Sequence, residues 1–188
     1  MSIGIEKQVT DQFVKDLSIK RIRNDLQSDL IYSPHVTSIF HLASDELFER
    51  LISKLNSGSY DPRLPITIEV PKASGFTRPG SILWPYERLA YQLAVDNIAE
   101  TSEKALNRNY VFSYPILLND PEGFMFKPAS ECFSGNKILA YCKGGKYSHV
   151  FIADVASFFE RLYQHALINL LTSAGCNTHI EMINGVRP

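Results

Sequence analysis

Cysteine is scarce in this sequence, and the few cysteines present exclude two common kinds of stabilising site. Cys132, Cys142 and Cys176 are odd in number and have no CxxC spacing, so neither a disulfide framework nor a closed zinc site is expected. The histidines have no HxxxH or HxxE spacing that would indicate metal ligands. We therefore expect the cysteines to be small buried residues of a reducing, cytoplasmic protein.

Long apolar runs and an excess of either charge are also absent. No stretch reaches the roughly 18 to 20 apolar residues of a membrane span, and Met1–Lys7 lacks the pattern of a signal peptide, so no membrane partner is expected. The 19 basic and 20 acidic residues leave a net charge of -1. The chain therefore lacks the overall basic character of many small nucleic-acid-binding proteins, and any basic surface must be local.

An ordinary globular composition is what remains. With 188 residues, 45% of them hydrophobic and 21% charged, the chain can form one domain or two small lobes. Two amphipathic segments favour helices in the first part. One spans 5–28, with apolar residues at helical spacing, and the other begins at a cap provided by Ser44 or Asp45 and ends before the Asn56-Ser57-Gly58 turn. The expected apolar stripe of the first helix is Ile5, Val9, Phe13 and Leu17.

Strand signals follow, so the fold class is expected to be α+β. The alternating, β-branched run 66–70 and the run 81–84 predict two strands around a polar tip at 71–80. Pro85 then favours the first turn of a helix that continues towards Leu106 and packs under this hairpin. Its expected buried stripe is Tyr86, Leu89, Ala90, Leu93 and Ala94.

Near the end of the chain, a buried strand is expected at 147–153 and a helix at 157–174. One face of that helix would carry Phe159, Leu162, Tyr163, Ala166 and Leu170, and Gly175 would end it. Asp154 lies where the strand gives way to the helix. A carboxylate held there is suited to binding Mg²⁺ beside a nucleotide phosphate, although an isolated Asp at such a position is more often a helix N-cap.

The residues around Asp154 add a family resemblance. The run from Asp154 to Phe159, followed by Glu160-Arg161-Leu162-Tyr163-Gln164-His165, resembles motif A of bacterial reverse transcriptases. The resemblance implies that Asp154 is the first metal-binding, catalytic carboxylate of a polymerase palm. It also implies that Phe159 closes the nucleotide pocket against the sugar, a role compatible with a core-facing helix position.

The predicted hairpin carries a second part of the resemblance. The run from Val70 to Gly80, VPKASGFTRPG, resembles the fingers hairpin of the same family, in which a Lys and an Arg hold the incoming triphosphate. Lys72 and Arg78 would have that role here. The chemistry is reasonable, because Lys offers a point charge and Arg a planar fork for phosphate oxygens. Without the resemblance, such a tip is usually only a solvated turn.

Two further segments extend the resemblance. Arg88-Leu89-Ala90-Tyr91-Gln92 resembles the helix after the hairpin, and the run Gly123 to Pro128 resembles the segment that precedes motif A. Arg88 and Gln92 lie one helical turn apart, so they can face a nucleic-acid strand or pair with neighbouring side chains. Both readings stay open.

The resemblance covers about 26–175 and is nearest to retron, abortive-infection and defence-associated enzymes. It implies the fingers and partial palm of a right-hand polymerase, with N-terminal helices and fingers at 1–146 and the beginning of the palm at 147–188. The implied ligands are Mg²⁺, deoxynucleoside triphosphates, an RNA template and a DNA product. The implied role is RNA-directed DNA polymerisation in phage defence. A homo-oligomer is also compatible with the sequence.

One expected feature of an active polymerase is missing. The family takes further metal-binding carboxylates from a Tyr-x-Asp-Asp turn, but no two Asp residues adjoin anywhere, and Glu160 and Glu181 are the only acids after Asp154. Two-metal phosphoryl transfer needs several carboxylates. We therefore expect a truncated chain that is inactive alone. The alternatives are a non-catalytic nucleic-acid-binding or oligomerisation module, and an unrelated α+β protein in which Asp154 is only a cap.

Overall fold

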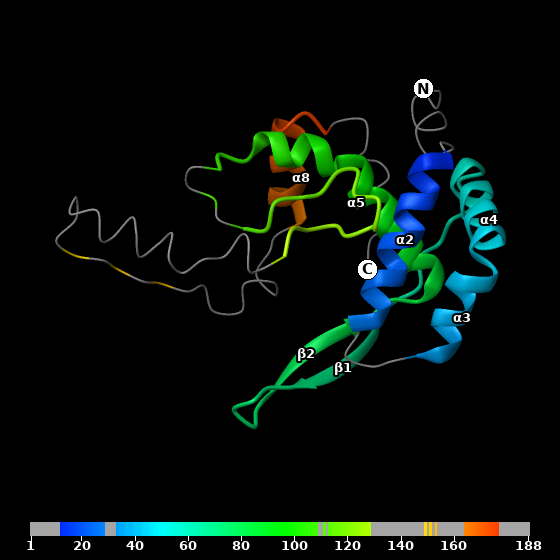
Figure 1. The fold of residues 1–188 in the computed structure, drawn as a ribbon, viewed down its shortest axis with the longest axis horizontal. Helices are drawn as coiled ribbons and strands as arrows, with labels where there is room; N and C mark the ends of the chain where they lie inside the picture. The colour runs from blue at the N-terminus through cyan, green and yellow to red at the C-terminus, as the bar shows by residue number, and fades with distance from the viewer. Residues whose placement is uncertain are drawn as a thin grey trace.

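The computed structural model describes residues 12–28, 33–108, 111, 113–128, 149, 151, 153 and 164–176. Its elements are α2 (Gln12–Ser28), α3 (Pro34–Leu42), α4 (Ser44–Asn56), β1 (Ile66–Pro71), β2 (Thr77–Ile82), α5 (Pro85–Ala105) and α8 (Gln164–Ser173) (Figure 1). The α+β class is confirmed. No helix among these residues is long and apolar enough to cross a membrane. The domain boundary expected after residue 146 lies outside the described residues.

The core is formed where α2, α3, α4 and α5 meet, and Figure 1 shows α2 lying along α5. The predicted stripe of α5 is correct, since Leu89, Ala90, Leu93 and Ala94 are all buried, and Pro85 occupies the first turn of the helix. The largest interface of α5 is with α2, rather than with the hairpin that we expected it to underlie.

Of the stripe predicted for α2, Ile5, Val9 and the Phe13 side chain lie outside what the structure describes, and Leu17 does not fit. Leu17 is only half-buried, whereas Ile19, Ile22 and Leu26 form the buried stripe. The helix is covered by α5 and α3, so it buries a broader face that also includes polar residues. The spacing of apolar residues therefore predicted that this segment is a helix, but not which face of the helix is buried.

Helix α4 ends at Asn56 as expected, but neither Ser44 nor Asp45 caps it. The N-cap is Ala43, which makes no side-chain cap hydrogen bond. The Ala43 N–H instead donates to the Ile39 carbonyl at 2.9 Å, and its carbonyl accepts from the Leu47 N–H at 3.0 Å. Because α3 leads almost directly into α4, the groups that a cap would satisfy already have backbone partners.

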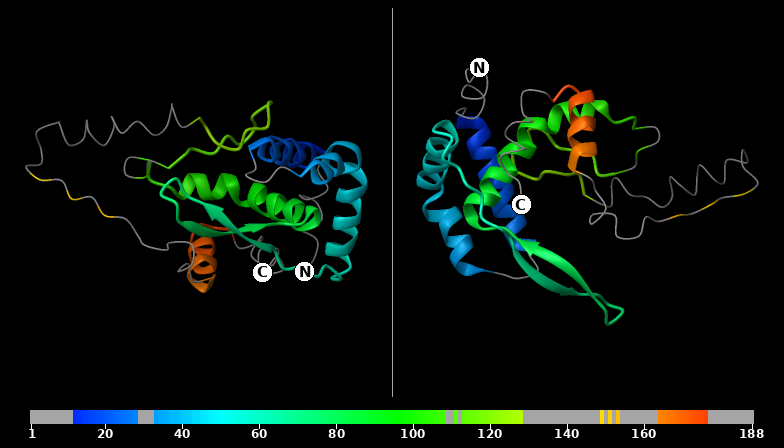
Figure 2. Two further views of the ribbon diagram at one scale, coloured as in Figure 1. Left: turned by 90° about the horizontal axis from the view of Figure 1, so that it is seen from below. Right: turned by 180° about the vertical axis from the view of Figure 1, so that it is seen from behind.

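The strands β1 and β2 form the expected antiparallel hairpin, with Ile66 opposite Ile82 and Pro71 opposite Thr77. Figures 1 and 2 show it extending away from the helices. Strand β2 begins earlier than the sequence indicated, at Thr77 rather than Ser81. Trp84 anchors the base of the hairpin, where its indole Nε1–H donates to the Leu64 carbonyl at 3.2 Å.

The predicted strand at 147–153 is not found at its three described positions. His149, Phe151 and Ala153 belong to no strand, and all are exposed, Phe151 by 92%. A buried strand needs a hydrogen-bonded neighbour, and the sheet of the described residues contains only β1 and β2. The expectation of a buried strand is therefore wrong at these positions.

Helix α8 ends as expected but buries a different face. Gly175 has a φ of +91°, and the Cys176 N–H donates to the Leu171 carbonyl at 2.9 Å, which closes the helix. Leu171 and Cys176 are buried, whereas Leu170, predicted to be on the buried face, is 66% exposed. Figures 1 and 2 show α8 beside α5.

Candidate functional site

The hairpin tip has a defined turn that fixes the position of Lys72. The Lys72 N–H donates to the Phe76 carbonyl at 2.7 Å, and the Gly75 N–H donates to the Lys72 carbonyl at 3.0 Å. Gly75 has a φ of +83°, a conformation that side-chain-bearing residues rarely adopt. This is a three-residue loop closed by a glycine bulge, and it places Lys72 directly opposite Phe76.

Lys72 and Arg78 lie on the same face of the hairpin. Val70 is opposite Arg78, and directly opposed residues share a face, as do residues two apart along one strand. Phe76, 74% exposed, lies on that face as well. Among the described residues, neither cation has a hydrogen-bond or ion-pair partner. The tip therefore presents two uncompensated positive charges and an aromatic ring in one direction.

Towards its base the same face becomes aliphatic. Gly80 lies under the side chains of Val70 and Ile68, since a Cβ at Gly80 would come within 2.7 Å of Val70 Cγ2 and 3.3 Å of Ile68 Cγ1. The glycine thus allows two branched side chains to lie flat across the strand. The face is divided into a cationic tip and an apolar base, an arrangement suited to a phosphate-bearing ligand at the tip.

Gln92 and Arg88 are not arranged as an exposed pair on α5. Gln92 is only 7% exposed, and its Nε2 donates to Asp96 Oδ1 at 2.8 Å and approaches Met125 Sδ at 3.7 Å. Arg88 is half-buried and takes part in a contact within the chain. For Gln92 the structure favours the internal-pairing interpretation over contact with nucleic acid.

Asp154 and Phe159, the expected metal and sugar contacts, lie outside the described residues. Within the described ranges, no three His, Cys, Asp or Glu side chains come close enough together to hold a metal ion. The donors that a Mg²⁺ site would need are therefore not supplied by the hairpin and helices alone.

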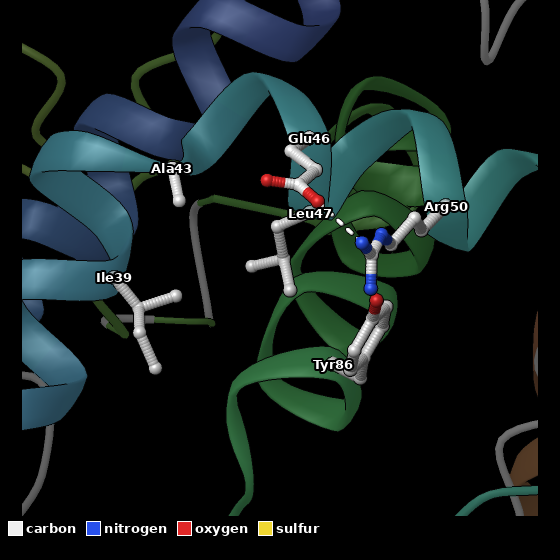
Figure 3. Close-up of a pocket in the computed structure, with 6 residues that line it drawn as sticks. All are labelled: Ile39, Ala43, Glu46, Leu47, Arg50 and Tyr86. Atoms are coloured by element: carbon white, nitrogen blue, oxygen red, sulfur yellow. Dashed lines mark hydrogen bonds and ion pairs between the residues drawn. The ribbon is translucent and has the colours of Figure 1, made fainter.

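A shallow pocket lies between α3, α4 and the start of α5 (Figure 3). It has a volume of about 160 Å³ and is lined by Ile39, Ala43, Glu46, Leu47, Arg50 and Tyr86. Its two charged residues are both exposed and form an ion pair with each other. Pockets for drug-sized ligands usually reach about 300 Å³ or more, so this one does not suit a nucleotide.

No family model, curated protein or solved structure matches this chain. The resemblance to reverse transcriptases thus consists of the residues quoted above and their order along the chain.

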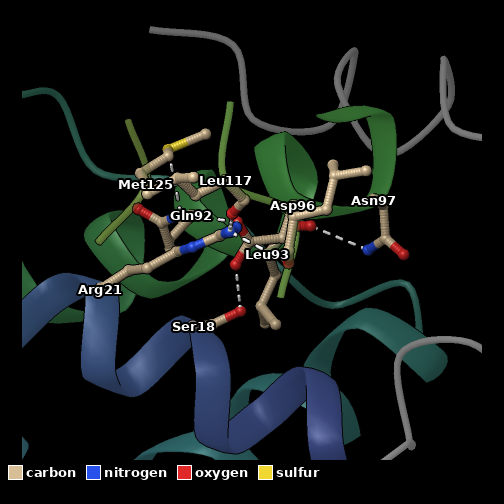
Figure 4. Close-up of polar contacts among 9 residues, drawn as sticks. Ser18, Arg21, Gln92, Leu93, Asp96, Asn97, Leu117 and Met125 are labelled. Atoms are coloured by element: carbon tan, nitrogen blue, oxygen red, sulfur yellow. Dashed lines mark hydrogen bonds and ion pairs between the residues drawn. The ribbon is translucent and has the colours of Figure 1, made fainter. Parts of the chain in front are cut away.

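A buried polar cluster that the sequence did not indicate supports the helices from which the hairpin projects. Arg21 and Asp96 form an ion pair whose side chains are 2% and 5% exposed. Asp96 also accepts from the Ser18 hydroxyl, and the Arg21 guanidinium donates to the carbonyls of Leu117 and Leu118 (Figure 4). Since donors from α2 and α5 already occupy the Asp96 carboxylate, we assign this cluster a structural role.

The cluster joins α2 and α5 to the segment 113–128. That segment folds back on itself, with Leu117 N–H donating to the Met125 carbonyl at 2.8 Å and Lys127 N–H donating to the Pro115 carbonyl at 3.1 Å. It also receives a hydrogen bond from α2, because Asn24 Nδ2 donates to the Glu122 carbonyl at 2.8 Å. No local pattern in the sequence predicts these contacts, because their partners are far apart along the chain.

Proposed function

We propose that this chain is the N-terminal portion of an RNA-directed DNA polymerase, and that its hairpin holds the triphosphate of an incoming deoxynucleotide. The observation that carries the proposal is the placement of Lys72 and Arg78 on one exposed face at a glycine-closed tip. The resemblance to defence-associated reverse transcriptases extends the proposal to a role in phage defence. Asp154 and Phe159 would belong to the palm of the same enzyme.

The charges at the tip are suited to a triphosphate. The guanidinium of Arg78 can donate two parallel hydrogen bonds to phosphate oxygens, and the Lys72 ammonium can neutralise a neighbouring oxygen. Neither cation has to break an existing bond with a described residue in order to bind. By itself the chain is not expected to polymerise, because the Asp-Asp pair from which the family takes its further metal-binding carboxylates does not occur in its sequence.

The test is the affinity of the chain for a fluorescent deoxynucleoside triphosphate with Mg²⁺, measured by fluorescence anisotropy. We expect Lys72→Ala and Arg78→Ala each to raise the Kd roughly tenfold, the effect of losing one charge-assisted contact. Lys104→Ala is the matched control, since it removes one exposed positive charge from α5 and leaves the hairpin intact. Equal Kd values for the two hairpin variants and the control would refute the proposal.

A second candidate function is a non-catalytic nucleic-acid-binding module. Tyr114 and Phe126 are both about half exposed, with ring centroids 6.5 Å apart, and Lys127 follows directly in the chain. Exposed aromatic side chains next to a cation can stack on the bases of single strands. Salt-dependent RNA binding that Tyr114→Ala weakens, without any triphosphate binding, would favour this module over the polymerase fragment.

A further inference from the structure

The two edges of the hairpin differ in the backbone groups that they present. The bond from the Lys72 N–H to the Phe76 carbonyl makes Lys72 and Phe76 a hydrogen-bonded pair. Hydrogen-bonded and non-hydrogen-bonded pairs alternate along an antiparallel ladder, and residues of a non-hydrogen-bonded pair direct their N–H and C=O groups outward, away from the partner strand. With the observed register, Thr67 and Glu69 therefore direct their N–H and C=O groups outward from β1. On β2 the outward residue opposite Glu69 is Pro79.

Pro79 blocks the outer edge of β2, because proline has no N–H to offer a further strand. The outer edge of β1 has no such block between Ile66 and Val70. No strand of the described residues pairs with it, since the sheet contains only β1 and β2. An edge with unpaired donors and acceptors and β-branched residues is a template for another strand.

We infer that β1 pairs, antiparallel, with β1 of a second copy of this chain. The two-fold axis would pass beside Ile68, so that Thr67 of each copy lies opposite Glu69 of the other. The outward N–H and C=O groups of Thr67 and Glu69 would then all be hydrogen-bonded. Pro65 and Pro71, which flank the run and lack an N–H, would lie opposite each other, so neither would leave a donor unpaired.

Neighbouring registers are less favourable. A shift towards the tip places Glu69 opposite Glu69 of the second copy, and like charges directly opposed are destabilising. It also places Thr67 opposite Pro71, which has no N–H to donate to the Thr67 carbonyl. A shift towards the base places Glu69 opposite Pro65, so the Glu69 carbonyl loses its donor in the same way. The run from Pro65 to Pro71 is thus self-complementary in one register.

The apolar face supports the same partner. Ile66, Ile68 and Val70 share a face, and Ile66 is 43% exposed in one copy. In the inferred register the two Ile68 side chains meet at the axis, and each Ile66 lies beside Val70 of the second copy. The apolar row of Ile66, Ile68 and Val70 on one hairpin would therefore continue directly into the same row of the second copy.

Sedimentation velocity of the full 188-residue chain tests the inference, with protein from roughly 1 to 100 µM. We expect a reversible dimer. Thr67→Pro removes an outward N–H while leaving the β1 and β2 ladder intact, and should raise the dimer Kd at least about tenfold. Ser81→Pro is the matched control, since it removes an outward N–H from the other edge and should leave the Kd unchanged. A chain that stays monomeric throughout would overturn the inference.

A second pair of variants tests the register without using proline. Thr67→Glu places two carboxylates opposite each other, and Thr67→Lys places an ammonium opposite Glu69. Each contact occurs twice in the dimer, so we expect the Kd to rise roughly two- to thirty-fold with Glu and to fall with Lys. Dimers insensitive to both substitutions would show that β1 does not pair in this way. Far-UV circular dichroism would verify that each variant is folded.

Discussion

The buried ion pair between Arg21 and Asp96 makes a quantitative prediction about stability. Replacing Arg21 with Met keeps the length of the side chain but leaves the Asp96 carboxylate, 5% exposed, without a positive partner. Breaking a buried pair in this way typically costs about 3–5 kcal/mol. The Ser18 hydroxyl and Gln92 amide still donate to Asp96, so we expect the lower end of this range, about 3 kcal/mol.

Urea unfolding followed by circular dichroism would measure this loss as a change in the free energy of unfolding. Arg50→Met is the matched control, because Arg50 and Glu46 form an ion pair whose side chains are 65% and 63% exposed. Exposed pairs of this kind contribute about 0.5 kcal/mol or less. The double variant Arg21→Met/Asp96→Leu should be more stable than Arg21→Met, since no buried charge remains.

Two results would contradict this reasoning. One is a decrease in the free energy of unfolding that is as small for Arg21→Met as for Arg50→Met. The other is a double variant that loses at least the sum of both single effects, which would mean that the two residues act independently.

Two further predictions concern other parts of the fold. Gly123→Ala should destabilise the chain by about 2–3 kcal/mol, because φ is +78° and the new Cβ would lie 2.6 Å from Lys20 Cβ. Gly58→Ala should destabilise the chain by only about 1 kcal/mol, since its φ is +65° but no atom lies within 4 Å of the new Cβ. Equal losses of stability for the two variants in thermal unfolding would refute the steric argument. Burial, and then the negative charge of Glu87, raise the pKa of Tyr60 to about 12. A raised pKa means that the folded state resists ionisation, so the free energy of unfolding should fall as pH rises from about 10 through about 12, and Tyr60→Phe should remove this part of the loss. An ultraviolet titration in which every tyrosine ionises near pH 10 would contradict the prediction.

The elements that the sequence predicted well are those with local signals. Pro85 begins α5 and the apolar period after it gives the buried face, because both depend on residues within a few positions. The β-branched run at 66–70 gives β1 for the same reason. The partner strand was harder to predict, since its start depends on the turn, and only the short loop closed by Gly75 places β2 at Thr77.

The candidate site was predicted in part for the same reason. The sequence named Lys72 and Arg78, but a wide tip at 71–80 left their relative positions undefined. The register of the hairpin decides that they share a face. The position of Gln92 on α5 did not reveal that its side chain is buried. Its burial depends on contacts with Asp96 and Met125, and Met125 is distant in sequence.

Polar residues inside α2 show why the remaining part of the core was missed. Lys15, Ser18 and Arg21 have the composition of a solvent-exposed face, yet all three are buried. Lys15 reaches Asp45 with 2.7 Å between Nζ and Oδ1, and Arg21 meets Asp96 on α5. A sequence pattern assigns such residues to the surface, since their burial depends on partners supplied by other elements.

The contact between Arg21 and the carbonyl of Leu117 spans 96 residues, which affects the order of events while the ribosome makes the chain. Helix α2 emerges early, but the partners that allow its guanidinium to leave water arrive only after α5 and the start of segment 113–128. Until then the Arg21 guanidinium lacks the partners that it has in the folded chain, so it should remain in water. Stable closure of the core therefore waits until segment 113–128 has been made, and α2 and α3 would expose apolar surface in the meantime.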